Sequence, residues 1–323
     1  MIKWGIIGTG FIANEFAKDF VNAESGKLVA VSSRSLKKAN KFANRYNIKM
    51  RFDSYEKLAN SKEIDVVYVA TPNTMHFENA YMLLKNNKHV LCEKPITINQ
   101  KELKKLIDLA KKKDLLFMEG MWSLFQPGIV QAKKWIDNNE IGKIKTLKAE
   151  FGFKAEFNPE NRLFNLKLGG GSLLDIGIYP IALATYIFKS FPSDLNTLGY
   201  IGKTGVDEQL HINLKYENDQ IATLSSSLLT KYNDDAFIYG TDGYIHIPNF
   251  WHSKKAVLVK GNKRIEYNTP TKAHGYAYEV DHINKLLKNS IKESPIISYN
   301  HSLISMKIMD NVRKDINLKY PFE

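Results

Sequence analysis

The sequence predicts an α/β protein: a Rossmann domain with a doubly wound parallel sheet, followed by an α+β domain with an open, mostly antiparallel sheet. Over the first 120 residues, apolar runs of strand length alternate with amphipathic helical stretches. Several of these runs are continuously apolar, as in strands that are buried on both faces. From about residue 194 to 267, by contrast, strand runs follow one another across tight turns. The 323 residues therefore divide into domains at 1–120 and 121–323.

In the first domain, expected strands and expected helices alternate along the chain. The strands are Lys3–Gly8, Lys27–Ser33, Asp65–Ala70, His89–Cys92 and Leu115–Glu119. The helices between them are Ala13–Asn22, Leu36–Tyr46, Phe77–Asn86 and Asn99–Lys113. Such βαβα order is typical of a parallel sheet covered by helices.

The second domain mixes helices with hairpins. Helices are expected at Gln126–Asn138, Ser172–Phe188, Tyr278–Asn289 and His301–Leu318. Strands are expected at Leu210–Tyr216, Gln220–Leu228, Ala236–Gly240, Tyr244–Ile247, Ala256–Val259 and Arg264–Tyr267. Leu210, Ile212 and Leu214 alternate along one strand face, and an open sheet would expose them. Burial of that face against a second copy predicts a homodimer.

Composition favours a cytoplasmic enzyme. No apolar run approaches the roughly 20 residues of a membrane span, and the N-terminus enters a strand pattern without features of a signal peptide. The single cysteine, Cys92, fits a reducing compartment. The formal charge of +12 comes from scattered lysines on outward helix faces, so we expect no nucleic-acid partner. The histidines are dispersed, so we expect no metal.

The first strand leads into the motif Gly8-Thr9-Gly10-Phe11-Ile12-Ala13 and then a helix. Glycine permits a tight turn and lets the backbone approach a pyrophosphate, to which the helix start presents free amides. An ordinary strand-to-helix turn is the alternative interpretation. The position between a buried strand and an amphipathic helix favours dinucleotide binding.

The second strand ends in Ser32-Ser33-Arg34-Ser35, and no acid occurs between Glu24 and Asp53. NAD-binding chains usually place an acid here for the ribose 2′-hydroxyl. A guanidinium with serine hydroxyls instead suits the 2′-phosphate of NADP(H). Arg34 could also be an exposed arginine that begins a helix.

Two more motifs follow strands of the first domain. They are Thr71-Pro72-Asn73-Thr74-Met75-His76 and Cys92-Glu93-Lys94-Pro95. Loops at the C-terminal ends of parallel strands line the cofactor crevice. Taken alone, the first motif is better explained as a turn followed by a helix cap, and Lys94 of the second motif as a surface lysine.

Together, these motifs resemble the Gfo/Idh/MocA oxidoreductase family along the whole chain. The second half is similar to its dihydrodiol dehydrogenase and NADP-dependent xylose dehydrogenase branch. That similarity is carried by MEGMW (118–122), GGGSLLDIGIYPI (169–181), ESPIIS (293–298) and KYPFE (319–323).

The resemblance implies roles for individual residues. The pyrophosphate would lie on Gly8, Gly10, Phe11 and Ile12, and the 2′-phosphate on Ser33 and Arg34. The nicotinamide side would be lined by Thr71, Asn73, His76, Glu93, Lys94 and Pro95, with Arg162 reaching the cofactor from the second domain. Trp122 and Phe153 would wall the substrate pocket. Lys94, Asp175 and Tyr179 would be catalytic, although many family members carry histidine at the position of Tyr179.

The chemistry of these residues is coherent. Hydride transfer from an alcohol carbon needs a group that removes the hydroxyl proton. A tyrosine has an ordinary pKa of about 10, and a nearby ammonium group such as Lys94 lowers such a pKa. Asp175 lies four residues before Tyr179, on the same face of a helix. Alternatively, Tyr179 packs in the helix and Asp175 caps its first turn.

These observations predict an oxidoreductase that transfers a hydride between NADP(H) and a secondary hydroxyl or carbonyl of a sugar, polyol or cyclic diol. An NAD-linked sugar or inositol dehydrogenase is one alternative. The other is a catalytically silent NADP-binding regulator on the same scaffold, because fold does not determine function.

Overall fold

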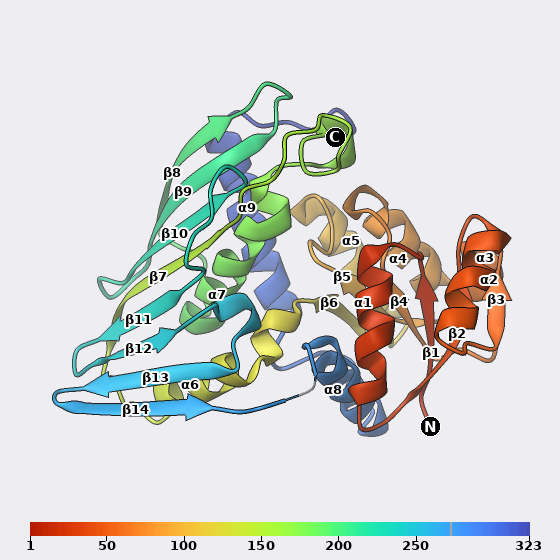
Figure 1. Cartoon of the computed structure of the whole chain (residues 1–323), viewed down its shortest axis with the longest axis horizontal. Coiled ribbons are helices and arrows are strands. Elements are labelled where there is room, and N and C mark those ends of the chain that lie inside the picture. Colours follow the sequence, from red (N-terminus) through yellow and green to blue (C-terminus); the bar gives the residue numbers. More distant parts are fainter. Residues whose placement is uncertain (272) are drawn as a thin grey trace. The chain divides into compact units, whose positions relative to one another are not determined.

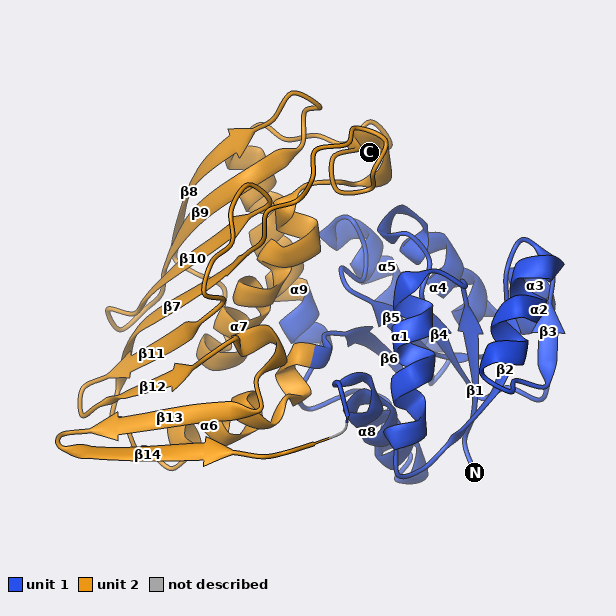
Figure 2. Cartoon of the chain, viewed as in Figure 1, with its two compact units in different colours: residues 1–122, 272–302 blue, residues 123–271, 303–323 orange. Residues whose placement is uncertain are grey.

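The computed structural model describes residues 1–271 and 273–323. Contacts between Cα atoms divide this part of the chain into two compact units (Figure 2). Unit 1 comprises residues 1–122 and 273–302, and unit 2 comprises residues 123–271 and 303–323. Each unit is built around its own sheet (Figure 1).

Unit 1 contains the predicted doubly wound parallel sheet. Its six strands lie in the order β3-β2-β1-β4-β5-β6, and every neighbouring pair is parallel. The strands are β1 (Lys3–Ile7), β2 (Lys27–Ser32), β3 (Met50–Phe52), β4 (Val66–Val69), β5 (His89–Glu93) and β6 (Phe117–Gly120). All four residues of β4 are buried, because helices cover both faces of a doubly wound sheet. The predicted Rossmann fold is therefore confirmed.

The helices of unit 1 follow from periodicity and caps. They are α1 (Phe11–Asp19), α2 (Leu36–Arg45), α3 (Tyr55–Ala59), α4 (His76–Lys85), α5 (Gln100–Lys112) and α8 (Tyr276–Lys288). In α5, the apolar positions at helical spacing are all buried: Leu103, Leu106, Ile107 and Ala110. The side chain of Asn99 accepts a hydrogen bond from the Glu102 amide and so caps the start of α5.

Residues 273–302 belong to unit 1, whereas we expected the second domain to run without interruption from 121 to 323. The buried carboxylate of Asp19, at the end of α1, accepts hydrogen bonds from the amides of His274, Gly275 and Ala277. It thus satisfies the free donors at the start of α8. Trp4 also donates to Asn284 in α8. These partners lie more than 250 residues apart, and no local pattern marks them.

Unit 2 contains the predicted open sheet. Its eight strands lie in the order β14-β13-β12-β11-β7-β10-β9-β8, and only β7 and β10 pair in parallel. The strands are β7 (Ile144–Gly152), β8 (Asp194–Ile201), β9 (Asp207–Lys215), β10 (Ile221–Ser227), β11 (Ala236–Gly240), β12 (Tyr244–Ile247), β13 (Lys255–Lys260) and β14 (Lys263–Asn268). The sheet is mostly antiparallel, as expected.

One face of this sheet is covered by helices, and the apolar residues of β9 lie on that face. Helices α6 (Pro127–Asp137) and α7 (Ile178–Phe188) contact the sheet, and α9 (Tyr299–Asp315) follows near the C-terminus. Leu210, Ile212 and Leu214 are at most 1% exposed, so the expectation that they lie on the open face was wrong. Alternation shows that one face is apolar but does not show where the chain's own helices pack.

The helical stretch that ends with α7 is long and apolar enough to span a membrane, whereas we expected no such stretch. Among the described residues, the helical stretch Leu166–Phe188 has a mean hydropathy of 1.4 over its most apolar window. Of that window, 78% is buried, as expected for a helix in a protein core.

Candidate functional site

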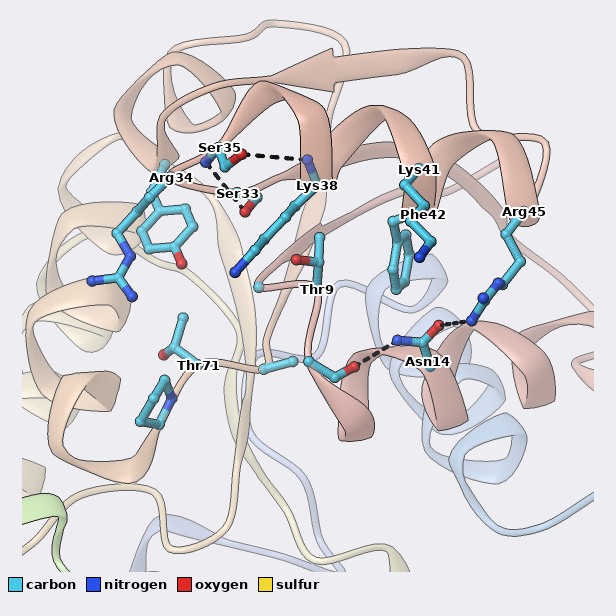
Figure 3. Close-up of a pocket in the computed structure, with 15 residues that line it drawn as sticks. Thr9, Asn14, Ser33, Arg34, Ser35, Lys38, Lys41, Phe42, Arg45 and Thr71 are labelled. Carbon is cyan, nitrogen blue, oxygen red and sulfur yellow. Dashed lines mark hydrogen bonds between the residues drawn. The ribbon is translucent and has the colours of Figure 1, made fainter. Parts of the chain in front are cut away.

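The glycine turn between β1 and α1 lies at a cavity of about 600 Å³ in unit 1 (Figure 3). Gly8 has a φ of +100°, and a Cβ there would lie 2.5 Å from the Ala70 carbonyl oxygen. Gly8 is therefore required by close packing against β4. Gly10 is different, because no described atom lies within 4 Å of the position of its missing Cβ. The open space lies at the start of α1, where a pyrophosphate would meet backbone amides.

The other side of the cavity is basic. Arg34, Lys38, Lys41 and Arg45 line it, together with the hydroxyls of Ser33, Ser35 and Tyr55. Arg34 and Lys38 reach into it near the start of α2 (Figure 3). None of the lining residues within the described chain is Asp or Glu. A dianionic phosphate fits such a group of cations and hydroxyls.

Asn14 links Arg45 to the glycine turn through hydrogen bonds. The guanidinium Nη1 of Arg45 donates to Asn14 Oδ1 over 3.0 Å, and the Tyr46 hydroxyl donates to the same oxygen over 2.8 Å. Asn14 Nδ2 in turn donates to the Gly10 carbonyl oxygen over 2.7 Å. Asn14, Lys38, Lys41 and Arg45 are not among the cofactor-binding residues that the sequence motifs predicted. A basic residue every three or four positions along α2 is the signal that could have indicated the last three.

Thr71 lines this cavity, but His76 is buried behind it. The ring nitrogens of His76 lie 2.7 Å from the Pro95 carbonyl oxygen and 2.9 Å from that of Thr71. Burial is the main cause that lowers the pKa of His76, and Lys94 adds to it. The neutral ring has one N–H and can donate to only one of the two carbonyls at a time. His76 therefore joins two loops of unit 1, whereas Asn73 lies in the turn before it, with Oδ1 accepting from the Thr74 amide.

The loop after β5 carries Lys94 between two buried carboxyl groups. Glu93 accepts a hydrogen bond from the Tyr68 hydroxyl, and burial raises the pKa of Glu93 to about 7. Glu119 accepts from the Ile96 amide and from the Ser302 hydroxyl. The side chain of Lys94 is half-buried, whereas Glu93 and Pro95 are buried. Glu93 also accepts from the Lys94 amide, so the two carboxyls hold the loop backbone at Lys94 and at Ile96.

In unit 2, Asp175 forms an ion pair with Arg162. The guanidinium contacts both carboxylate oxygens, over 2.9 and 3.3 Å. Asp175 is 14% exposed and Arg162 is 66% exposed. A two-point contact of this kind fixes the orientation of the carboxylate. Arg162 thus pairs with a residue of its own unit.

Tyr179 lies in an aromatic cluster of unit 2. Its ring centroid is 5.4 Å from that of Phe151 and 6.4 Å from that of Trp251. Phe151 and Trp251 stack at 4.8 Å, and Phe153 adjoins Phe151. The expected pocket residue Phe153 therefore adjoins a neighbour of Tyr179, whereas Trp122 lies in unit 1 and stacks on Tyr276.

Trp251 is a neighbour of Tyr179 that the sequence analysis missed. Its indole N–H donates to Asp234, a buried residue that also pairs with Lys231 and accepts from the Gly152 amide. Trp251 lies 72 residues after Tyr179, in a short turn without a motif. Only the folding of unit 2 places it beside Tyr179.

Comparisons with known proteins agree with this geometry. The sequence model of the oxidoreductase family with an NAD-binding Rossmann fold matches residues 2–121, and that of the Gfo/Idh/MocA C-terminal domain matches residues 129–246. A trans-1,2-dihydrobenzene-1,2-diol dehydrogenase of Xenopus laevis is 36% identical, with 99% of each chain covered. The chain belongs to the Gfo/Idh/MocA oxidoreductase family.

Other relatives of this oxidoreductase differ in their named substrates. A scyllo-inositol 2-dehydrogenase (NADP(+)) of Bacillus subtilis is 32% identical, with 99% of each chain covered. The solved aldose-aldose oxidoreductase of Caulobacter crescentus has a TM-score of 0.89 at 22% identity, covering 98% of this chain and 97% of its own. A 3-ketoreductase of Actinomadura kijaniata has a TM-score of 0.84 at 24% identity, with 97% of each chain covered. The two structures show that the fold is shared.

The site of this oxidoreductase holds a nicotinamide dinucleotide in a Rossmann domain. Within residues 1–271 and 273–323, no three or more His, Cys, Asp or Glu side chains are grouped so as to hold a metal ion. The catalytic residues that the sequence predicted are Lys94 in unit 1 and Asp175 and Tyr179 in unit 2.

Proposed function

We propose that this oxidoreductase uses NADP(H) and acts on a secondary hydroxyl or carbonyl of a sugar, polyol or cyclic diol. The observation that carries the cofactor assignment is the cavity lined by Arg34, Lys38, Lys41 and Arg45. A 2′-phosphate would gain several charge-assisted hydrogen bonds there, whereas the 2′-hydroxyl of NAD would leave four cations without an anionic partner. The names of the relatives, which include diol and NADP-linked inositol dehydrogenases, support the substrate class.

When bound, the nicotinamide accepts or supplies the hydride. The residues of this chain would then manage the substrate and its proton. Lys94 would hold the substrate oxygen, because its loop is fixed by two buried carboxyls. Tyr179 would move the proton at the hydroxyl oxygen. Asp175, held in a two-point contact by Arg162, would orient the substrate.

The open face of the unit 2 sheet supports a homodimer, although with other residues than we first expected. Leu198, Tyr200 and Ile221 are 72%, 54% and 46% exposed. They pair with His211, Gln209 and Lys215 of β9, and thus lie opposite to the buried leucines. Phe237 stacks on His246 at 4.3 Å on this same face. We propose that a second copy covers it, because these apolar side chains lie exposed on a sheet face that no helix of the described chain covers, and a twofold mate would remove them from water.

Arg34→Asp tests the cofactor assignment. We expect it to raise KM for NADP+ at least tenfold more than KM for NAD+, because a charge-assisted contact to a phosphate contributes about 1.5–3 kcal/mol. The matched control is Arg51→Asp, an exposed arginine of β3 that does not line the cavity. The assay is reduction of each dinucleotide in the presence of a panel of cyclic diols, pentoses, hexoses and inositols.

Three outcomes would change the proposal. A wild-type preference for NAD+ would reject the cofactor assignment. Equal loss of both dinucleotides in Arg34→Asp would place Arg34 outside the 2′-phosphate site. Tight NADPH binding without turnover of any compound in the panel would favour a silent regulator.

Light scattering tests the proposed dimer. A monodisperse monomer at micromolar concentration would contradict the proposed interface.

A further inference from the structure

Asp207, the first residue of β9, is a fully buried acid that no motif indicated. Its Oδ2 accepts a hydrogen bond from the Ser172 hydroxyl over 2.8 Å and from the Leu173 amide over 2.6 Å. The Ser172 hydroxyl also lies 2.9 Å from that of Ser226 in β10. The carboxyl group of Asp207 therefore meets the start of the helical segment that leads into α7.

That segment begins with one π-helical turn, Leu173–Gly177, which continues directly into α7. No side-chain hydrogen bond from its own N-cap residue, Ser172, caps it. Asp207 supplies the cap instead, from a strand 34 residues later. A negative charge at a helix start also interacts favourably with the helix dipole. Asp175 is in this turn, and Tyr179 follows it in the first turn of α7.

The two glycines before the turn pack closely against neighbouring groups. Gly171 has a φ of +119°, and a Cβ there would lie 2.0 Å from Asp207 Oδ1. A Cβ on Gly170 would lie 2.7 Å from the Arg162 carbonyl oxygen. The buried Tyr320 hydroxyl, in the C-terminal tail, donates to the Gly170 carbonyl oxygen over 2.9 Å. The loop is thus enclosed by Asp207, the segment of Arg162 and the tail.

We propose that Asp207 is a positioning residue that holds the π-helical turn and thereby aims Asp175 and Tyr179. This rests on the proposed function, in which both residues act on the substrate. The ionised carboxyl holds the Leu173 amide and the Ser172 hydroxyl more firmly than the neutral acid does, because charge-assisted hydrogen bonds are the stronger ones. Turnover should therefore depend on the charge of Asp207.

Burial raises the pKa of Asp207 to about 7, and the hydrogen bonds from Leu173 and Ser172 act in the opposite direction. Among the described residues, Tyr320 is a titratable side chain that faces it, and burial raises the pKa of Tyr320 so that it stays neutral near pH 7. Lowering the pH through 7 protonates Asp207 and weakens the cap. We therefore expect kcat of the wild type to rise with pH through about 7.

The test compares Asp207→Asn with the control Asp194→Asn. Asp194 is an exposed residue at the start of the neighbouring strand β8, and its side chain accepts a hydrogen bond from the Leu195 amide. We expect Asp207→Asn to lower kcat at pH 8 about tenfold and to remove the rise near pH 7. NADPH binding, measured by fluorescence, should change less than twofold, because the basic cavity lies in unit 1. Asp194→Asn should match the wild type in all three.

Ser172→Ala is the second variant. It removes one hydrogen-bond donor to Oδ2 of Asp207 and keeps the carboxyl group. Because a donor favours the ionised form, its loss should raise the pKa of Asp207 and move the midpoint of the rise in kcat upward by a measurable fraction of a pH unit. A purely structural loss would lower kcat without moving this midpoint. Should Asp207→Asn fail to fold, the midpoint shift in Ser172→Ala decides the question.

Hydrogen exchange at residues 173–179 is measured in parallel, because it does not depend on turnover. Faster exchange in Asp207→Asn, but not in Asp194→Asn, supports the cap even if Tyr179→Phe shows that the chemical assignment is wrong. Unchanged exchange, or kcat within twofold of the wild type with the same pH profile, overturns the proposal.

Discussion

Asn14→Ala should separate the two dinucleotides without touching a charged residue. The asparagine holds Arg45 at the basic cavity and binds the Gly10 carbonyl oxygen at the glycine turn. The substitution removes both contacts and leaves Arg45 free to adopt other rotamers. It keeps the charge of the cavity, so an effect confined to NADP+ arises from the position of Arg45.

The magnitude follows from the contacts. A hydrogen bond from a charged donor contributes about 1.5–3 kcal/mol when well shielded, and the contact of Arg45 with Asn14 is exposed to solvent. We therefore take about 1 kcal/mol for NADP+, which corresponds to a roughly fivefold rise in its dissociation constant. NAD+ lacks the phosphate that Arg45 would meet, and we expect its affinity to fall less than about twofold.

The assay is a titration of intrinsic fluorescence with each dinucleotide. Asn22→Ala is the matched control, because this asparagine follows α1 and lies away from the cavity. Equal weakening of NADP+ and NAD+ by Asn14→Ala would mean that its bond to Gly10 dominates. That result would refute the reasoning about Arg45.

Three further predictions follow from the described contacts. Tyr179→Phe should lower kcat roughly 10²–10⁴-fold while the circular dichroism spectrum stays unchanged, because a positioned acid or base contributes that much; near-normal turnover with chemistry rate-limiting would make Tyr179 a pocket wall. Glu279 is fully buried, neither carboxyl oxygen has a hydrogen-bond partner in the described chain, and burial raises its pKa well above the usual value. The pKa of Glu279 is higher in the folded than in the unfolded protein, so ionisation of Glu279 lowers the free energy of unfolding as the pH rises. The melting temperature of Glu279→Gln should therefore fall less between pH 6 and 9 than that of the wild type. Parallel plots of melting temperature against pH for the two proteins would contradict this. Asp19→Ala should lower the free energy of unfolding by about 3 kcal/mol, because three amides near the start of α8 lose their acceptor; a loss below about 1 kcal/mol in urea unfolding would show that water replaces it.

Much of the site could be predicted because its signals are local. The glycine turn, Arg34 and the loop of Lys94 all lie at strand ends, and parallel strands bring such ends to one edge of a sheet. The roles of Asp175 and Tyr179 came from the resemblance, and they remain proposals. The structure adds the ion pair of Asp175 with Arg162, which no spacing rule predicts.

The sequence by itself determined the two fold classes, the dinucleotide turn and the absence of an acid after the second strand. These features depend on residues that are neighbours in the chain, so periodicity and turn chemistry report them directly. Tertiary structure alone decided that residues 273–302 return to unit 1, that the leucines of β9 face helices, and that His76 is buried. It also decided that Asp207 caps the turn of Asp175. The physical reason is that packing and most hydrogen bonds of buried polar groups join residues that the fold brings together, and those residues can lie tens or hundreds of positions apart in the chain.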